Sequence, residues 1–497
     1  MIVVADRRRL AALSFILVML FVAAACGQRP GIAARGLLTG ASGAAILPEG
    51  ATVTETGEII SAEGEVIGTV EEGITDPEAL EGIASGDTST TSGGTTGGGQ
   101  PGTSGGGGPG TGGGEPQEPS GATSPGVTEE VIKIGLHAPL SGAAPVPSDS
   151  VDRGKDLWFE WMEEQGTRLF GRRVEMVLKN DQYNPSTAVA VCKEMVEKDE
   201  VFALTGAAGT DQIQACARYA ESVGVPYISA GVTEVQVSGF RTYFTTSMTY
   251  PDQSPLLVDF MITKLGAKEE KNGMLFFDTA SFADSYDAFE AAAEDAGMPV
   301  EYKRKVPKTA GFDSAQQVVQ EMSLQGIENV FILTSPYYWI NVLKAANRQN
   351  YHPQWVGVGI TMTFDTVITA SCPDGTSAEG SKFFSPFPAY IDRDKYDPDF
   401  DRAVAELHPD KANPDDFMWL GWSGGKIIWE MLELPGKALT RDRFIYFLER
   451  ARGLQNGIGP KLNFTPEDHL GASEVHVSQA QCGDRRWHTI EDFVSDF

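Results

Sequence analysis

The sequence contains few of the residues on which metal binding and acid–base catalysis depend. It has 6 histidines in 497 residues, and no P-loop, His-Glu-x-x-His or paired Cys-x-x-Cys motif occurs in it. We therefore predict no catalytic residue, no metal site and no cofactor. Basic residues are also scarce, because 39 lysines and arginines stand against 68 aspartates and glutamates, giving a formal charge of -29. This balance argues against nucleic acid, whose phosphates bind to a basic face.

Long apolar runs are missing apart from one near the N-terminus. Arg7, Arg8 and Arg9 precede an apolar segment, residues 10–25, which ends in three alanines before Cys26. These are the features of a secretory signal, and the run is shorter than the roughly 20 residues of a membrane span. A cysteine directly after the small residues resembles the lipobox of bacterial lipoproteins. The resemblance implies removal of residues 1–25 and a lipid on Cys26; the alternative is a plain secretory signal followed by a chance cysteine.

Cysteine is scarce as well. Five are present, and four remain if Cys26 carries lipid: Cys192, Cys216, Cys372 and Cys482. An even number outside the cytoplasm predicts two disulfides, for which four cysteines allow three pairings.

Residues 26–126 lack the apolar content of a folded domain. The stretch 85–126 consists almost entirely of Gly, Ser, Thr and Pro. It cannot bury enough apolar surface to offset the entropy lost on ordering. We predict a tether between the membrane and the folded body, in which the weak alternation of residues 52–70 allows at most a stray hairpin.

From residue 131 onward, short apolar strands alternate with segments of helical periodicity. Strands are predicted at 131–136, 174–178, 202–205, 225–230, 274–277, 300–305, 330–334 and 355–359. Helices are predicted at 151–165, 186–198, 211–223, 285–296, 314–325 and 340–350. This alternation is typical of βαβ units around parallel sheets. Two such runs, divided near Tyr250, predict two doubly wound, Rossmann-like α/β lobes.

The fold also selects among the disulfide pairings. In a doubly wound sheet, the helices after the second and third strands lie side by side on one face. Cys192 and Cys216 fall on these two helices, so we expect them to pair. Cys372 and Cys482 then pair by elimination, which ties the C-terminal tail to the second lobe.

Small polar residues follow three strands of the first lobe: Ser141-Gly142, the stretch 206–211 and the stretch 229–233. Ligands of open α/β sheets bind beyond the carboxyl ends of the strands. A helix N-terminus with a threonine hydroxyl, as at Thr210, suits a carboxylate. Helix capping explains Thr210 or Asp211 alone, but it does not explain three such strand ends. We therefore predict a ligand site there.

Aromatic residues follow strand ends in the second lobe, namely Phe282, Tyr337, Tyr338 and Trp339. Each one taken alone fits core packing, whereas together they predict the wall of a cleft.

One stretch matches a hydrolase pattern. Gly421-Trp422-Ser423-Gly424-Gly425 has the spacing of a nucleophile elbow, with Asp484 and His488 downstream. An elbow needs a preceding strand and a sharp turn. Instead, residues 416–434 have the apolar spacing of one buried helix, so the sequence favours a non-enzymatic protein.

From residue 131 to the end, the chain resembles the leucine-binding-protein family of type I periplasmic binding proteins, the substrate-binding subunits of branched-chain amino acid ABC transporters. The segments that carry the resemblance are 134–136 with 139–142, Gly154, Asn180-Asp181, Asn184-Pro185 with 188–190, 224–229, and Phe312-Asp313. The resemblance implies two lobes joined by a three-crossover hinge, closing on a ligand. We assign residues 127–249 and 381–458 to the first lobe, and residues 250–380 and 459–497 to the second.

Carried over residue by residue, the resemblance implies that the ligand's carboxylate meets Thr210 and the N–H groups after Gly209. Its ammonium meets the Gly231 carbonyl and the Thr233 hydroxyl. The second lobe departs from the family, because Gly359 stands where the acidic partner of the ammonium is expected. Ser335 stands at the place of a tyrosine, and Pro147 at that of an aromatic residue.

An isolated ammonium in a closed cleft is costly without a carboxylate. Asp211, Glu234 or Asp365 are possible substitutes, and otherwise the ligand is a carboxylate, an amide or an aromatic compound. The predicted binding residues are Ser141, Thr210, Asp211, Gly231, Thr233, Phe282, Ser335 and Tyr337.

These features together predict a monomeric, extracytoplasmic lipoprotein, held to the bacterial cell membrane by lipid on Cys26. We expect it to deliver a small molecule to an ABC transporter permease. The alternative is a sensor subunit of the same fold, which reports the ligand to a partner protein.

Overall fold

The computed structural model describes residues 124–206, 208–229, 237–411 and 413–497, together with four short strands nearer the N-terminus. The chain divides into two compact units, Met1–Thr111 and Gly112–Phe497. Cys26, Gly231, Thr233 and Glu234 lie outside the described residues, so the predictions made for them stay predictions. Within the described part, no helix combines the length and the apolar character that crossing a bilayer requires.

The first unit contains a small antiparallel sheet. Its strands, paired in sequence order, are β1 (Thr52–Val53), β2 (Glu58–Ile60), β3 (Val66–Thr69) and β4 (Gly73–Ile74). The sequence predicted at most a hairpin here, so the sheet has more strands than expected.

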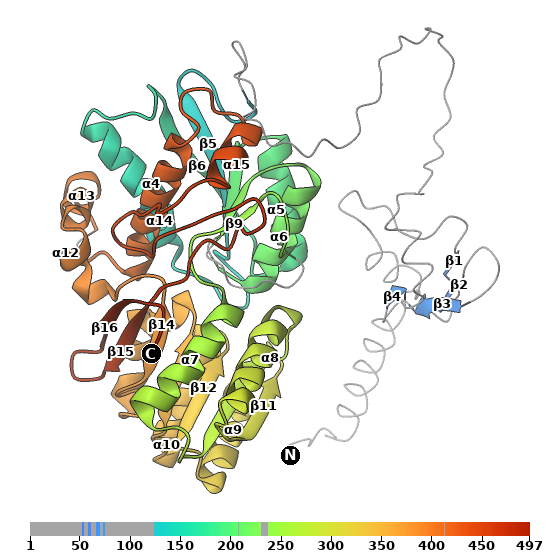
Figure 1. The fold of residues 1–497 in the computed structure, drawn as a ribbon, viewed down its shortest axis with the longest axis vertical. Coiled ribbons are helices and arrows are strands. Elements are labelled where there is room, and N and C mark those ends of the chain that lie inside the picture. Colours follow the sequence, from blue (N-terminus) through green and yellow to red (C-terminus); the bar gives the residue numbers. More distant parts are fainter. Residues whose placement is uncertain are drawn as a thin grey trace, which may run out of the picture. The chain divides into compact units, whose positions relative to one another are not determined.

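The second unit has two lobes (Figure 1). The first lobe is built on a parallel sheet with the order β6-β5-β7-β8-β9. Its strands are β5 (Val131–Ala138), β6 (Arg173–Asn180), β7 (Ala203–Gly206), β8 (Tyr227–Ser229) and β9 (Tyr243–Thr245). Its helices are α4 (Ser148–Glu164), α5 (Pro185–Glu197), α6 (Thr210–Ser222), α12 (Arg393–Tyr396), α13 (Asp399–Leu407), α14 (Asp416–Glu433) and α15 (Arg441–Leu448). Helices α4 and α14 pack together, and so do α5 and α6.

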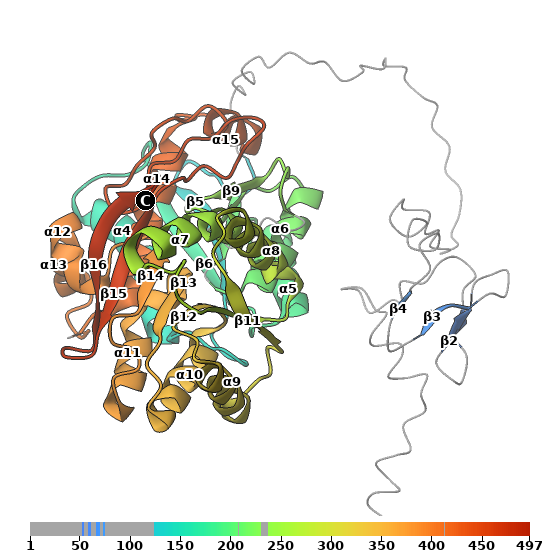
Figure 2. The same ribbon diagram turned by 60° about the horizontal axis from the view of Figure 1, so that its bottom comes forward.

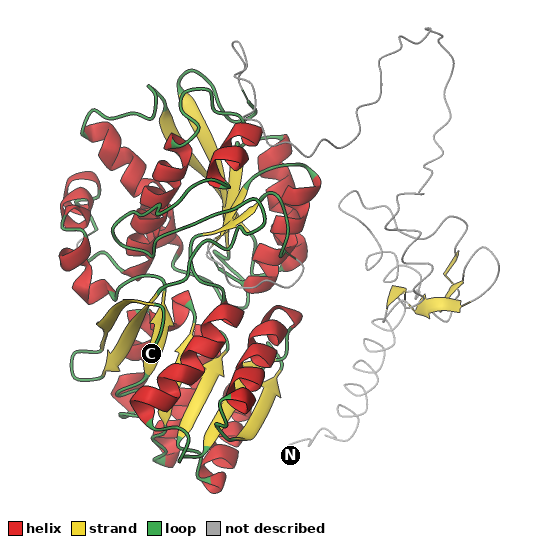
Figure 3. Ribbon diagram, viewed as in Figure 1, coloured by secondary structure: helices red, strands yellow, loops and turns green. Residues whose placement is uncertain are grey.

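The second lobe is built on a larger sheet with the order β11-β10-β12-β13-β14-β15-β16. Its strands are β10 (Asn272–Phe277), β11 (Val300–Val306), β12 (Asn329–Leu333), β13 (Gln354–Val358), β14 (Lys382–Ser385), β15 (Val475–Gln481) and β16 (Arg486–Val494). Its α-helices are α7 (Tyr250–Leu265), α8 (Ala280–Asp295), α9 (Phe312–Gln325), α10 (Pro336–Gln349) and α11 (Asp365–Ser371). Helix α7 packs on α8, and α9 packs on α10, so the sheet is covered by helices on both faces (Figures 2 and 3).

Local chemistry sets where the helices begin. Asn184 caps α5 by accepting a hydrogen bond from the Thr187 N–H at 3.1 Å, and Pro185 occupies the first helical position. Ser335 and Pro336 have the same arrangement at the start of α10. A capping oxygen satisfies an N–H that lacks a helical partner, and proline has no N–H to lose. These junctions therefore fix where each helix begins, a few residues after the preceding strand.

The two-lobe α/β fold predicted from the sequence is confirmed. The predicted strands and helices correspond to β5–β8, β10–β13, α4–α6 and α8–α10, with ends that differ by a few residues, and residues 416–434 are largely the single helix α14. The disulfides join Cys192 to Cys216, between α5 and α6, and Cys372 to Cys482. Both are the expected pairings.

The crossovers between the lobes differ from the predicted boundaries. Strand β14 pairs with β13 and β15 in the second sheet, so the chain returns to the first lobe after Ser385 and not after residue 380. Leu462, Phe464 and Ala472 pack into the first-lobe core, so the final crossover lies just before Val475 and not at residue 459.

Candidate ligand-binding site

A cleft lies between the lobes, at the carboxyl ends of both sheets. It encloses a cavity of about 560 Å³, which we call the interlobe cleft. First-lobe residues that line it are Ala143, Ala144, Pro145, Val146, Pro147, Tyr183, Ala208, Gly209, Thr210, Ile213 and Phe417. Second-lobe residues are Tyr250, Phe282, Leu333, Thr334, Ser335, Pro336, Tyr337, Ile340, Met362 and Thr366. The cleft thus occupies the position where open α/β sheets bind ligands.

Many helices point their N-termini at this cleft. Among the described residues, six helices of 13 or more residues place a lining residue at the N-cap or in the first turn. These are α4, α6, α7, α8, α10 and α14. Each N-terminus carries a partial positive charge, which stabilises a nearby anion by about 0.3–1 kcal/mol. No side chain caps α6, whose N-cap is Gly209, and both Gly209 and Thr210 line the cleft.

The cleft contains no ionisable acid or base other than tyrosine among its described lining residues. Burial, with a smaller contribution from Asp211, raises the pKa of Tyr183 to about 12. The phenol is therefore neutral at physiological pH. The cleft combines an apolar wall with the N-termini of six described helices, four of which carry an aspartate in the first turn.

The acidic partner of an amino-acid ammonium is absent from the described lining. Gly359, at the expected position, has φ of 123°, and a Cβ there would lie 3.2 Å from the Tyr250 hydroxyl. A carboxylate at this position would meet both a strained backbone and a crowded neighbour.

The two described substitutes are already bonded to other partners. Asp211 forms an ion pair with Lys308 and accepts a hydrogen bond from Ser281 Oγ at 2.5 Å. Asp365 accepts hydrogen bonds from Arg486 Nη1 at 2.6 Å and from the Trp487 N–H at 3.0 Å. Neither carboxylate lines the cleft.

Polar contacts join the lobes beside the cleft. Thr210 Oγ1 in the first lobe lies 2.8 Å from Ser281 Oγ in the second, and Lys308 of the second lobe pairs with Asp211 of the first. The Lys308 ammonium also stands over the ring of Tyr183, 5.0 Å from its centre. We call Thr210, Asp211, Ser281 and Lys308 the interlobe latch. Its bonds require both lobes, so separating them breaks every one.

A pair of buried aspartates lies where α11 and α14 begin. Burial, and then the proximity of Asp365, raises the pKa of the Asp416 carboxyl well above its ordinary value. Asp416 Oδ2 accepts the Asp365 backbone N–H at 3.2 Å. Next to them, the rings of Phe364 and Phe417 meet edge to face at 4.6 Å. This contact joins the second lobe to the first lobe at the floor of the cleft.

The structure brings together some of the predicted site residues. Thr210, Phe282, Ser335 and Tyr337 line the cleft, whereas Asp211 belongs to the latch. Ser141 lies outside the lining and accepts a hydrogen bond from Asn180 Nδ2 at 2.8 Å. Their roles toward a ligand stay predictions.

Two of the four aromatics considered at second-lobe strand ends belong to the core. Tyr338 and Trp339 are fully buried, and Trp339 packs against Trp355 with ring centres 5.0 Å apart. Tyr337 is 60% exposed at the rim of the cleft, because successive helical residues point in different directions.

Sequence reasoning missed several lining residues, including Tyr183, Tyr250, Met362 and Phe417. Tyr183 follows the second strand and was the easiest to find, since it lies at a strand end like Ser141. The others begin helices or turns whose approach to the cleft depends on how the lobes pack.

The hydrolase alternative at Ser423 is not supported. Ser423 is fully buried inside α14, and its hydroxyl donates to the Trp419 carbonyl at 2.9 Å. His488 and Asp484 bond to each other at 2.8 Å on the β15–β16 hairpin of the second lobe. A buried helical hydroxyl bonded to its own helix is not an exposed nucleophile.

Metal binding is equally unsupported by the described residues. Their one cluster of potential ligands is His137 with Cys192 and Cys216, and both cysteines are oxidised to a disulfide. His137 is itself bonded to Asp181 at 2.7 Å and to the Tyr227 hydroxyl at 2.6 Å. A disulfide sulfur is not a thiolate ligand, so this cluster is a buried structural network.

Two α/β lobes that meet at a cleft with apolar walls define a two-lobed binding protein. The sequence model of the periplasmic binding protein family matches residues 131–485. That match covers more than half of the chain, which therefore belongs to the periplasmic binding protein family. No curated protein sequence matches the chain.

Solved structures show the same fold. A fatty acid ABC transporter substrate-binding protein from Thermomonospora curvata has a TM-score of 0.62 at 19% identity, over 76% of this chain and 95% of that one. An ABC transporter solute-binding protein from R. palustris, in complex with benzoate, has a TM-score of 0.60 at 18% identity, over 74% and 98%. A branched chain amino acid ABC transporter protein from Thermus thermophilus, with bound valine, has a TM-score of 0.62 at 16% identity, over 74% and 97%. At these identities the likeness establishes the fold.

Proposed function

We propose that this protein captures a small carboxylate with an apolar body in the interlobe cleft and delivers it to an ABC transporter permease. The observation that carries the proposal is the chemistry of the cleft. Its described lining has no charged side chain, while six described helices direct their N-termini at it. An anion gains from the N-terminus of α6, which no side chain caps, and an ammonium finds no carboxylate in the described lining.

Desolvation strengthens this preference. Closing the lobes removes a ligand from water, and a charged group without a partner in a dry cleft is strongly disfavoured. A carboxylate finds the N–H groups at the start of α6, whereas an α-ammonium finds no carboxylate in the described lining. The proposed ligand therefore has one anionic head and no amino group.

The ligands of structural relatives are compatible with this choice. The Thermomonospora curvata protein belongs to a fatty acid transporter, and the R. palustris protein holds benzoate. Fatty acids and benzoate are carboxylates without an ammonium. The Thermus thermophilus protein holds valine, which carries one. An amino-acid site is expected to have an acidic residue where this chain has Gly359, so the lack of one favours a ligand without an ammonium.

A thermal-shift panel on the full chain tests the proposal, with amino acids, their deaminated acids, amides and aromatic acids as ligands. At about a hundred times its dissociation constant, a ligand stabilises the folded state by roughly 2.7 kcal/mol. We expect shifts with the acids and none with the amides. Melting-temperature shifts with amino acids alone would reject the proposed ligand class. No shift with any ligand of the panel would reject capture of these solutes altogether.

We further propose that the protein works outside the cytoplasmic membrane as a monomer anchored through lipid on Cys26. Membership of the periplasmic binding protein family implies an extracytoplasmic location, and the two disulfides fit an oxidising compartment. In this arrangement the chain from Cys26 to the first lobe links the anchor to the binding body.

A further inference from the structure

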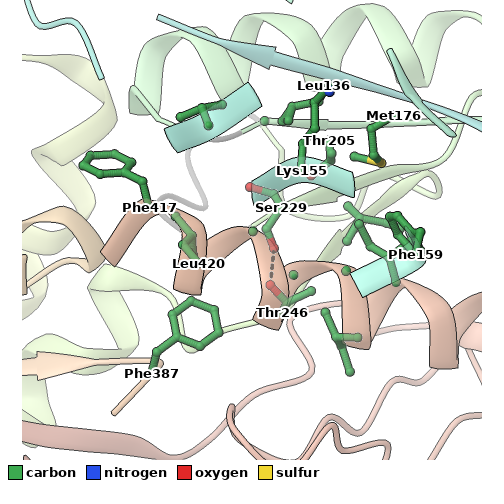
Figure 4. A pocket seen from close by; sticks show the side chains of 18 of the residues that line it. Leu136, Lys155, Phe159, Met176, Thr205, Ser229, Thr246, Phe387, Phe417 and Leu420 are labelled. Carbon is green, nitrogen blue, oxygen red and sulfur yellow. Dashed lines mark hydrogen bonds between the residues drawn. The ribbon is translucent and has the colours of Figure 1, made fainter. Parts of the chain in front are cut away.

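A second cavity lies inside the first lobe, between the sheet and helices α4 and α14. Its volume is about 120 Å³, and we call it the inner pocket. It is lined by Leu136, Val146, Val151, Lys155, Phe159, Met176, Thr205, Gly206, Ile228, Ser229, Thr246, Phe387, Phe417, Leu420, Gly421, Gly424, Gly425, Ile427 and Ile428. Figure 4 shows Phe417 and Leu420 on α14 along one side, with Leu136, Thr205 and Met176 on the side of the sheet.

The inner pocket is predominantly apolar, and its charged residue is already paired. Lys155 contributes its stem, while its ammonium bonds to Asp152 at 3.0 Å and to Asp156 at 2.6 Å. Thr246 donates its hydroxyl to the Ser229 carbonyl at 3.1 Å. The Ser229 hydroxyl is buried and has no hydrogen-bond partner among the described residues. Core packing leaves few gaps of this size, so the inner pocket is a candidate site for an apolar occupant.

The glycines of α14 that line the inner pocket have two different surroundings. A Cβ at Gly421 would lie 2.4 Å from the Gly154 carbonyl oxygen, and one at Gly425 would lie 2.8 Å from Trp158 Cβ. These two glycines let α14 approach α4 closely. Gly424 is different, because a Cβ there would meet nothing within 4 Å. Helix packing therefore does not require glycine at this position, although glycine is unfavourable in a helix interior.

The inner pocket adjoins the interlobe cleft. Val146 and Phe417 line both cavities, so these two side chains form the boundary between them. Phe417 lies in the first turn of α14, and Val146 lies just before α4. A ligand with its head in the cleft would pass between them to place its tail along α14.

We propose that the inner pocket holds the hydrocarbon tail of a straight-chain aliphatic carboxylate whose head is bound in the interlobe cleft. This inference rests on the proposed function and specifies its ligand class. An apolar cavity of about 150 Å³ in another protein stays dry and binds benzene. The inner pocket is of similar size and suits a short run of methylene groups.

Calorimetric titration of the full chain, purified without detergent, with n-alkanoates from butanoate to dodecanoate tests the inference. Affinity should rise about fourfold for each methylene that enters the pocket, from ~0.8 kcal/mol per buried CH₂, and then level off. Gly424→Leu places a side chain in the pocket, so its affinities should level off at a shorter acid, with the shortest acids unaffected. Leu420→Ala widens the pocket and should move the plateau to longer acids.

The matched control is Gly311→Leu, at another glycine where a Cβ would meet nothing within 4 Å and which lines neither cavity. It should retain the wild-type chain-length profile, and the melting temperature of every variant reports folding. An affinity that does not change with chain length, or a profile that Gly424→Leu and Leu420→Ala both leave unchanged, would overturn the inference while leaving carboxylate capture intact. Failure of every acid to bind would overturn the proposed function and this inference with it.

Discussion

Lys308 of the second lobe pairs with Asp211 of the first, and removing its charge tests whether the latch contributes to closure on a ligand. The Lys308→Met variant keeps an unbranched apolar stem and loses the ammonium. The two side chains are 26% and 25% exposed, so the pair is only partly screened by water. Exposed pairs contribute about 0–1 kcal/mol, and hydrogen bonds to charged groups about 1.5–3 kcal/mol.

Between these limits, we assign the Lys308–Asp211 pair about 1–1.4 kcal/mol. Because the pair exists only while the lobes are together, this free energy belongs to the closed form and so to ligand binding. Lys308→Met should therefore weaken binding about five- to tenfold. Salt screens exposed charges, so the difference between variant and wild type should shrink as ionic strength rises.

Isothermal titration of both proteins with the acid that gives the largest thermal shift measures this effect. Lys303→Met is the control, because Lys303 pairs with Glu290 inside the second lobe and its loss should leave affinity unchanged. Equal affinities for Lys308→Met and wild type would refute a role of the latch in closure. An equal loss in the Lys303 variant would attribute the effect to net charge.

Three further predictions concern stability and anchoring. Burial raises the pKa of Asp416, so above pH 4 the folded state keeps this proton while the unfolded chain releases it, and the free energy of unfolding falls as pH rises. In urea unfolding, Asp416→Asn should therefore be more stable than wild type at pH 7 but not at pH 4. An equal gain at both pH values would contradict this. Gly421→Ala pushes a methyl group against Gly154 and should cost about 1–3 kcal/mol, whereas Gly424→Ala should stabilise α14 by up to about 1 kcal/mol; chemical unfolding giving the same sign for both would be inconsistent with the packing described. Cys26→Ser should move the protein from the membrane to the soluble fraction, and retention in membranes would reject the lipid anchor.

Much of the fold follows from local patterns in the sequence. Apolar periodicity indicates most strands and helices of both lobes, and the positions of Cys192 and Cys216 on adjacent helices indicate their disulfide. Helices α7, α11–α13 and α15 and strands β9 and β14–β16 were not predicted. Helix α7 contains Pro255 and buries the polar residues Gln253 and Ser254, which interrupt its apolar periodicity, and β14 is a strand of only four residues.

The candidate site was predictable only in part. The strand-end rule pointed to Thr210, and the family resemblance pointed to Ser335 and to the missing carboxylate at Gly359. That Asp211 pairs with Lys308, 97 residues away, depends on how the lobes meet. The inner pocket could not be predicted from the sequence either, because nothing in the local sequence distinguishes Gly424 from its neighbour Gly425. Only the crossing of α4 and α14 makes one a packing contact and the other open space.

The cleft is proposed to accept a carboxylate and to have no place for an ammonium. Calorimetric titration with leucine and with 4-methylpentanoate, which is leucine without its amino group, tests this most directly because the two ligands differ in that group alone. We predict that 4-methylpentanoate binds and that leucine binds at least about tenfold more weakly, since its ammonium loses water and gains no partner. Leucine binding as tightly as 4-methylpentanoate, or more tightly, would contradict the proposed chemistry of the cleft.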